Sequence, residues 1–379
     1  MKLLIVFDIF SKFGGGSQLC SLRWFKNLNN LGIETYLLKN KTKEKLNIYP
    51  ERIIEIPALN LSFVFKGLEI GTFLTKEAIN KIKEVDLIIL NEPGLISFLL
   101  SLSQETKLLN KKLAFVFHTN YDYFSKNFRL DKFDFEGYFL KIGILPSLIF
   151  RNFIIKNSQA VIFVAKSFKK LYGKKIRKKS YYLPIPVSSD FFTGFKIKEK
   201  EPNSLVYFGR LSREKRVDII IKALRFINKK YKLFIIGEGQ ERDNLEELVR
   251  SLKLENQVEF LGWIENKNLP NILTEFDYFI SASNFEVFSF TYLESLLRGL
   301  PPFVYDYSSS REAIPSNCGI FIKSDEPNYW AKILLQYKNK GLFIDLQKNI
   351  LKAYPKFFKF HEENSSKRLK EICEDIIKK

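Results

Sequence analysis

The chain has 379 residues, of which 46% are hydrophobic, and a formal net charge of +19. This length predicts two domains. Its three cysteines, Cys20, Cys318 and Cys373, lie far apart without metal-ligand spacing, so neither a disulfide framework nor a zinc site is expected. We expect the protein to reside in a reducing compartment. Residues 1–190 contribute +14 of the charge, which a uniformly lysine-rich composition does not explain. We therefore expect this half to meet an anionic partner.

Short apolar runs alternate with helical patterns in the first half. The apolar amino terminus is interrupted by Asp8 and precedes no cleavage site, so it reads as a strand and not as a signal peptide. No apolar run reaches the roughly 18 residues of a transmembrane helix. A helix is expected over Ser17–Leu31, which Gly32 closes. The pattern predicts a parallel sheet covered by helices, with buried strands at Leu3–Phe7, Glu34–Leu38, Leu87–Leu90, Leu113–His118 and Ala160–Val164.

A linker is expected where Leu183–Asp190 and the polar stretch Lys196–Asn203 break this pattern. We assign residues 1–190 to one domain, 191–354 to a second, and 355–379 to a helix. Two doubly wound α/β domains would leave a cleft between the carboxyl ends of their strands. The second series is predicted as strand Ser204–Phe208, helix Val217–Ile227, strand Lys232–Ile236, helix Gln240–Leu252, strand Val258–Leu261, helix Lys267–Thr274 and strand Tyr278–Ser281.

The most informative motif is Glu286-Val-Phe288-Ser-Phe-Thr-Tyr-Leu-Glu294. It follows a predicted strand and enters a helix expected over Tyr292–Arg298. The backbone N–H groups of Ser289, Phe290 and Thr291 open that helix, and such an end holds a diphosphate. The two carboxylates suit sugar and ribose hydroxyls, which donate hydrogen bonds to them. A sugar-nucleotide site is the favoured interpretation.

Two further loops follow predicted strands of the second half. Gly209-Arg210 and Lys215 would place two cations where they neutralise a leaving diphosphate, although most such runs are exposed basic loops. Gly237-Glu238-Gly239 forms a tight turn that lets backbone approach a ligand, which alone is a weak signal.

Gly14-Gly15-Gly16 follows the first strand, but Leu19 stands where the dinucleotide fingerprint needs a third glycine. These glycines could still form a loop that a donor or acceptor approaches closely. The sequence contains no GK[ST] phosphate loop. His118 closes a predicted strand. We interpret it as facing the cleft; the alternative is a hydrogen-bonded core histidine.

The segment Lys166–Lys179 holds eight basic residues and no acidic one. Anionic lipid headgroups attract such a segment, and the neighbouring aromatic stretch Phe133–Phe153 would insert at the interface. Of the other interpretations of this segment, a solvated helix face ranks second and a nucleic-acid site third. We predict no nucleic acid as a partner. The basic side chains are Lys166, Lys169, Lys170, Lys174, Lys175, Arg177, Lys178 and Lys179.

Taken together, these motifs resemble the family-4 retaining glycosyltransferases of the GT-B fold. The resemblance is strong over residues 204–325 and looser over 1–190, where Gly14–Gly16, His118-Thr119 and Ala160–Lys166 match the usual landmarks. It implies two Rossmann-like domains: residues 1–190 would bind the acceptor and residues 191–354 the nucleotide-sugar donor, with the helix of residues 355–379 crossing back to the first domain. It also implies retention of the anomeric configuration and neither a metal nor another cofactor.

The resemblance also implies residue roles. Arg210 and Lys215 would bind the diphosphate, Glu286 the transferred sugar and Glu294 the ribose, with His118 facing sugar and acceptor. The base would lie near Gly237–Gln240 and Trp263-Ile264. The chain departs from the family at Val287, Ser289 and Arg216, where glycines are common, and at Pro184-Ile185-Pro186, where an Asn-Gly turn is usual.

We therefore expect a cytoplasmic glycosyltransferase, peripheral on the inner face of the membrane, that transfers a hexose from a UDP- or GDP-sugar to a lipid-linked or glycan acceptor. A non-catalytic sugar-nucleotide or glycan-binding protein is the alternative from another class. A GT-B epimerase or phosphorylase is the third; an epimerase would change a nucleotide-sugar without any acceptor.

Overall fold

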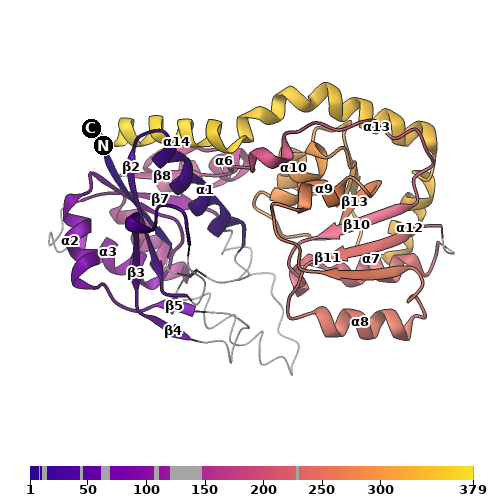
Figure 1. The fold of residues 1–379 in the computed structure, drawn as a ribbon, viewed down its shortest axis with the longest axis horizontal. Coiled ribbons are helices and arrows are strands. Elements are labelled where there is room, and N and C mark those ends of the chain that lie inside the picture. Colours follow the sequence, from indigo (N-terminus) through magenta and orange to yellow (C-terminus); the bar gives the residue numbers. More distant parts are fainter. Residues whose placement is uncertain are drawn as a thin grey trace. The chain divides into compact units, whose positions relative to one another are not determined.

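The structure is a computed structural model that describes residues 1–7, 9–10, 15–42, 46–60, 69–105, 111–119, 147–227 and 230–378. The chain divides into two compact units (Figure 1). Unit 1 combines Met1–Pro186 with Glu362–Lys379, and unit 2 is Val187–His361. The units thus change at residues 186 and 361, where the sequence analysis placed boundaries at 190 and 354.

Unit 1 is built on a parallel seven-stranded sheet with the order β3-β2-β1-β6-β7-β8-β9. Residues 147–157 are helical. The named elements are β1 (Lys2–Phe7), α1 (Gly16–Asn30), β2 (Glu34–Asn40), η1 (Pro50–Arg52), β3 (Ile53–Ile56), β4 (Ala58–Asn60), β5 (Glu69–Gly71), α2 (Lys76–Glu84), β6 (Leu87–Leu90), α3 (Leu95–Glu105), β7 (Lys112–Phe117), β8 (Ala160–Phe163), α6 (Lys166–Ile176), β9 (Lys179–Tyr182) and α14 (Glu362–Ile377).

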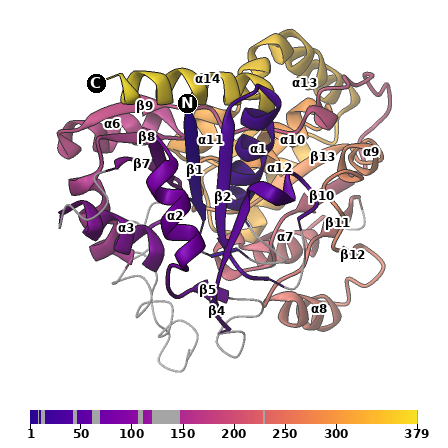
Figure 2. The ribbon, with the colours of Figure 1, turned by 60° about the vertical axis from the view of Figure 1, so that its left-hand side comes forward.

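The central strands of this sheet read as continuous apolar runs because helices cover both faces. In β1, Leu3, Leu4, Ile5 and Val6 are all fully buried. Helix α14 packs against α1 and passes the amino end of β1 (Figures 1 and 2).

A buried serine fastens α14 to the rest of unit 1. Trp24 of α1 donates from Nε1 to Ser365 Oγ at 2.9 Å, and Ser365 Oγ donates to the Pro184 carbonyl at 2.5 Å. Asn27 Nδ2 donates to Glu362 Oε2 at 3.1 Å. The last helix of the chain therefore belongs to the core of its first unit.

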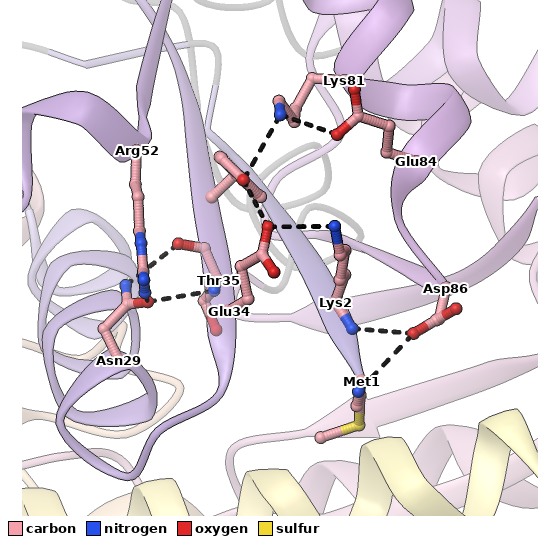
Figure 3. A network of polar contacts seen from close by, with 10 residues as sticks. Met1, Lys2, Asn29, Glu34, Thr35, Arg52, Lys81, Glu84 and Asp86 are labelled. Atoms are coloured by element: carbon pink, nitrogen blue, oxygen red, sulfur yellow. Dashed lines mark hydrogen bonds and ion pairs between the residues drawn. The ribbon is translucent and has the colours of Figure 1, made fainter.

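The amino ends of β1 and β2 carry a polar network (Figure 3). The Lys2 amide donates to Asp86 at 2.7 Å, and its ammonium lies 3.3 Å from Glu34. Lys81 pairs with Glu84 at 2.8 Å. Ligands of parallel sheets bind at the opposite, carboxyl ends of the strands, so this exposed network is structural and contributes little stability.

Unit 2 holds a parallel six-stranded sheet with the order β12-β11-β10-β13-β14-β15. Figure 1 shows its strands between α8 on one side and α9 and α10 on the other. The elements are η2 (Ser189–Phe191), β10 (Ser204–Phe208), η3 (Arg213–Lys215), α7 (Val217–Leu224), β11 (Lys232–Ile236), α8 (Arg242–Ser251), β12 (Val258–Gly262), α9 (Leu269–Leu273), β13 (Tyr278–Ser281), α10 (Phe290–Leu297), β14 (Pro302–Tyr305), α11 (Ser308–Ala313), β15 (Ile320–Ile322), α12 (Pro327–Gln336), α13 (Lys340–Ala353) and η4 (Tyr354–Phe360).

The predicted α/β class with two doubly wound, Rossmann-like halves is confirmed. In unit 2 the loops after β10, β11 and β13 leave the carboxyl edge of the sheet side by side, since β11, β10 and β13 are neighbours. Those loops carry most of the predicted site residues.

Candidate active site

The centre of the candidate site is an ion pair between two loops of unit 2. Lys215 ends η3 after β10, and Glu286 lies between β13 and α10. Lys215 Nζ donates to Glu286 Oε1 at 2.5 Å, and their side chains are 22% and 16% exposed. A charge-assisted bond in this partly dry setting is stronger than one at the surface. The structure thus joins a predicted phosphate ligand to a predicted sugar ligand.

A buried tyrosine, which the sequence analysis missed, holds the backbone of the loop that carries Arg210. Tyr207 of β10 is 2% exposed and donates from its hydroxyl to the Arg210 carbonyl at 2.7 Å. Burial and then the negative charge of Glu286 raise the pKa of Tyr207 well above its usual value, while Arg210 lowers it. Burial and the charge of Glu286 also raise the pKa of Tyr292. Arg210, Glu286 and both tyrosines therefore share one electrostatic environment.

Arg210 and Lys215 differ in their pairing. The Arg210 side chain is exposed, and within the described part of the chain it forms no ion pair. Its backbone is held by Tyr207, and the next residue, Leu211, donates to the Glu238 carbonyl at 3.0 Å. Arg210 thus offers a guanidinium on a fixed backbone, while Lys215 shares its charge with Glu286.

The glycines after β11 pack the neighbouring loop instead of opening space. A Cβ on Gly237 would lie 1.9 Å from the Gly209 carbonyl oxygen, and one on Gly239 would lie 2.1 Å from the Leu211 carbonyl oxygen. Gly237 also has φ +137°, and Gly209 has φ +150°. The close approach that these glycines permit is between two backbones, so they set the position of the Arg210 loop.

Helix α10 begins two residues before the predicted start. Ser289 is its N-cap residue with extended backbone, and the Ser289 and Thr291 hydroxyls lie 2.9 Å apart. The first amides of a helix lack intrahelical acceptors, and the dipole favours an anion there. Phe290, 8% exposed, and Glu294, 3% exposed, follow in the helix.

Other predicted ligands have packing roles or lie at the rim. Phe288 is 8% exposed and its ring centroid lies 5.4 Å from that of Phe360 in η4, so it belongs to the core. Glu238 accepts from Arg242 at 3.1 Å. Trp263 is 49% exposed just after β12, with Ile264 half-buried beside it.

Arg216 shows why glycine suits the position after the lysine. Its backbone is left-handed, with φ +53° and ψ 40°, between η3 and α7. A side chain there costs on the order of 1 kcal/mol. Arg216 pairs with Asp325 at 2.5 Å, which offsets part of this strain.

In unit 1, His118 follows β7 and is half-buried. Its Nε2 lies 2.7 Å from Asn91 Oδ1, and its ring lies 5.9 Å from the Trp24 ring. Burial lowers the pKa of His118 to about 3, so the imidazole is neutral at pH 7. Asn91, which the sequence analysis missed, follows buried strand β6 and is itself fully buried. The sequence could have indicated Asn91, because it is a polar residue directly after the apolar run Leu87–Leu90.

The glycine loop after β1 is only partly described. Gly15 is the N-cap residue of α1 and Gly16 its first residue, and the Leu19 amide donates to the Gly15 carbonyl at 3.2 Å. Gly14 lies outside the described residues, as do residues 120–146, which include much of the aromatic stretch Phe133–Phe153 predicted to insert at a membrane interface.

The basic segment forms α6 and the start of β9. Lys166, Lys170, Lys174, Lys175 and Arg177 are exposed, while Lys169 and Lys178 are half-buried. Leu171 is 52% exposed among them. Lys179 differs, because it pairs with Asp375 of α14 at 2.6 Å. The ammonium group of Lys166 lies 5.2 Å from the centroid of the Tyr182 ring.

The described residues contain no group of three or more His, Cys, Asp or Glu side chains placed to hold a metal ion. No helix among them combines the length and apolar character that a membrane span requires.

Comparisons with known proteins identify the domain that carries this site. Residues 190–356 match the family model of glycosyl transferases group 1. An uncharacterized glycosyltransferase of Methanocaldococcus jannaschii is 27% identical over 238 residues, which span 59% of this chain and 57% of that relative. An alpha-monoglucosyldiacylglycerol synthase of Streptococcus pneumoniae is 34% identical over 101 residues, or 26% of this chain and 23% of that enzyme. Both matches leave a large part of the relative's own length uncovered.

The crystal structure of Anabaena HepE in complex with UDP and glucose resembles the whole chain. The TM-score is 0.74 at 15% identity, with 98% of this chain and 99% of that chain covered. The protein therefore has the predicted GT-B fold. Residues 190–356 of the chain resemble glycosyl transferases group 1 in sequence, as the sequence analysis expected for the second half.

Proposed function

We propose that the protein is a retaining, metal-independent hexosyltransferase that uses a UDP- or GDP-sugar. The observation that carries this proposal is the contact between Lys215 and Glu286 at the start of α10. It joins a cation for a diphosphate, a carboxylate for a sugar hydroxyl and a helix amino end in one group 1 domain.

In this proposal Arg210 and Lys215 neutralise the charge that grows on the leaving diphosphate. The amides at Ser289, Phe290 and Thr291 complete the phosphate site, Glu286 accepts from the transferred sugar, and Glu294 accepts from the ribose. Exposed Trp263 would stack on the base, since a flat aromatic face suits it. Retention and independence of metal come from the family resemblance and are tested directly below.

We place the acceptor at the cytoplasmic face of a membrane, as a lipid-linked or glycan molecule. The exposed lysines of α6, with Leu171 among them, support an anionic lipid surface. The similarity to a relative named for a glucosyldiacylglycerol product points the same way.

The test is turnover on defined donors. Purified protein is incubated with UDP-glucose, UDP-N-acetylglucosamine or GDP-mannose and with diacylglycerol vesicles, with and without EDTA, and NMR reads the anomeric configuration of the product. The proposal predicts transfer with retention that survives EDTA. A changed donor sugar without acceptor would indicate an epimerase, and nucleotide binding without any turnover would indicate a non-catalytic binder.

Residue roles require a matched control. Lys232 and Glu259 form an exposed pair at 2.7 Å in the same unit. Lys232→Ala and Glu259→Gln are expected to transfer at the wild-type rate, whereas Lys215→Ala and Glu286→Gln are not. Equal rates for the two pairs of variants would remove the site assignment.

A further inference from the structure

A chain of hydrogen bonds in unit 1 fixes which nitrogen of His118 carries the proton. It begins in the first turn of α1, where the Ser21 hydroxyl donates to the Ser17 carbonyl at 3.1 Å. The single proton of Ser21 is therefore used, and its oxygen is left to accept.

Asn91 is the next member of the chain. Its Nδ2 donates to Ser21 Oγ and, at 3.2 Å, to the Ser17 carbonyl. A carbonyl can only accept, and the Ser21 proton already points elsewhere, so both contacts require the amide nitrogen on this side. Asn91 Oδ1 must therefore face His118.

The orientation of Asn91 decides the histidine tautomer. Asn91 Oδ1 is an acceptor and lies 2.7 Å from His118 Nε2, so Nε2 must carry the hydrogen. In a neutral imidazole the other nitrogen then holds a lone pair. Asn91 and Ser21 are fully buried, so water does not compete for these bonds.

We propose that Asn91 is a positioning residue that holds His118 as the Nε2–H tautomer and reserves Nδ1 as a hydrogen-bond acceptor for a substrate hydroxyl. The role of Nδ1 toward substrate rests on the proposed function. A histidine in the opposite tautomer would present an N–H at Nδ1 and would repel a donating hydroxyl proton. The low basicity of the buried ring fits orientation of a hydroxyl better than removal of its proton.

The tautomer can be measured without any substrate. The chain has only two histidines, His118 and His361. Full-length protein labelled with ¹⁵N-histidine gives two ring systems in a two-bond ¹H–¹⁵N correlation spectrum, and His361→Gln assigns them. We expect the unprotonated, downfield nitrogen of His118 to be Nδ1, which correlates with Hε1 alone. A downfield Nε2, or a doubly protonated ring at pH 7, would overturn the proposal.

Variants separate positioning from general destabilisation. Asn91→Leu removes the acceptor that faces Nε2–H and is expected to give mixed tautomers. Asn29→Leu is the matched control, because Asn29 is also buried and bonded to both the amide and the carbonyl of Thr35 at 3.0 Å (Figure 3). It should leave the His118 spectrum unchanged. An unchanged spectrum in Asn91→Leu contradicts the inference, and if that variant does not fold, the wild-type spectrum decides it.

Kinetics then tests the consequence. Asn91→Leu is expected to lower kcat about tenfold with little change in the donor KM. If the spectra confirm the tautomer but no donor is turned over, the proposed function fails while the assignment of Asn91 stands. If turnover is normal in Asn91→Leu despite mixed tautomers, the role of Nδ1 is refuted.

Discussion

Lys215 and Glu286 are 71 residues apart in the sequence, yet their charged groups meet at 2.5 Å. A diphosphate that binds Lys215 competes with Glu286 for the same ammonium group. A sugar hydroxyl that donates to Glu286 competes with Lys215 in turn. Donor binding is therefore expected to replace the contact between Lys215 and Glu286 by two contacts, one from Lys215 to the diphosphate and one from a sugar hydroxyl to Glu286.

This exchange predicts distinct effects for the two members of the pair. Lys215→Ala should lower kcat/KM by about 100-fold, since it removes a cation from the leaving group in a partly dry site. Glu286→Gln should lower it less, because the amide still accepts from a hydroxyl. Initial rates at varied donor concentration measure both, and a larger loss for Glu286→Gln would reverse the assigned roles.

Replacement of Gly237 by alanine is predicted to destabilise unit 2 strongly. Its Cβ would meet the Gly209 carbonyl at 1.9 Å on a backbone with φ +137°, which should cost about 3 kcal/mol or more. Gly194→Ala is the control, because Gly194 also has positive φ (+73°) but nothing lies within 4 Å of its Cβ position. Its cost should stay near 1 kcal/mol. Urea unfolding compares the two, and equal costs would contradict the packing argument.

His118 is predicted to make stability depend on pH in the acid range. Its pKa is about 3 in the folded protein, against an ordinary value of 6.5. Above 6.5 neither state binds the proton and stability is complete; as pH falls toward 3, only the unfolded chain binds it, so stability is lost. Because the ring is partly exposed, we expect a loss of about 2 kcal/mol at most between pH 6.5 and roughly pH 4.5.

The variant His118→Gln should lack this component of the acid loss. His361→Gln, which removes the other histidine, is the matched control. Urea unfolding at a series of pH values provides the measurement. If both variants show the wild-type slope, burial of His118 does not cause the loss.

The exposed lysines of α6 are predicted to bind anionic vesicles. Replacing Lys170, Lys174 and Lys175 by glutamine should weaken sedimentation with phosphatidylglycerol vesicles by about 1 kcal/mol per lysine at low salt. The control replaces Lys222, Lys230 and Lys232, which removes the same charge from exposed sites of unit 2. Equal weakening in both would mean that net charge alone acts, and added salt should abolish the difference.

Ser365 is predicted to matter more than its neighbour. Ser365→Ala leaves the buried Trp24 indole N–H and the Pro184 carbonyl without this partner, at a cost of about 1–3 kcal/mol. Ser366 is equally buried, but its hydroxyl donates only to the Glu362 carbonyl of its own helix at 2.7 Å. Thermal unfolding of Ser366→Ala should stay close to wild type. A similar loss in both variants would argue against the link to Trp24.

The predicted strands at β10, β11 and β13 agree with the structure residue for residue, because buried parallel strands appear as short apolar runs. The short strands β3, β4, β5 and β9 of unit 1 were not predicted, and neither were β14 and β15 of unit 2. β14 begins with Pro302, directly after the glycine and proline that end α10, and β15 has only three residues. Neither length nor composition separates such strands from loops.

The charged residues of the site could be predicted from the sequence, but the residues that hold its loops in place could not. Glu286 and Lys215 stood out because charged side chains followed buried strands. In the sequence Tyr207 looks like one more aromatic residue of the core. Only the structure shows that its hydroxyl donates a hydrogen bond to the Arg210 carbonyl. Gly237 was expected to face a ligand; spacing alone cannot tell which backbone approaches it, and that backbone is Gly209.

The discontinuity of unit 1 has a consequence for synthesis. Helix α14 leaves the ribosome only after all of unit 2 has emerged, and units generally fold as they appear. Unit 2 can thus fold first, whereas α1 is packed completely only after α14 has emerged. A nascent chain stopped short of Glu362 would leave the Trp24 region of α1 uncovered, in the form that chaperones and proteases recognise.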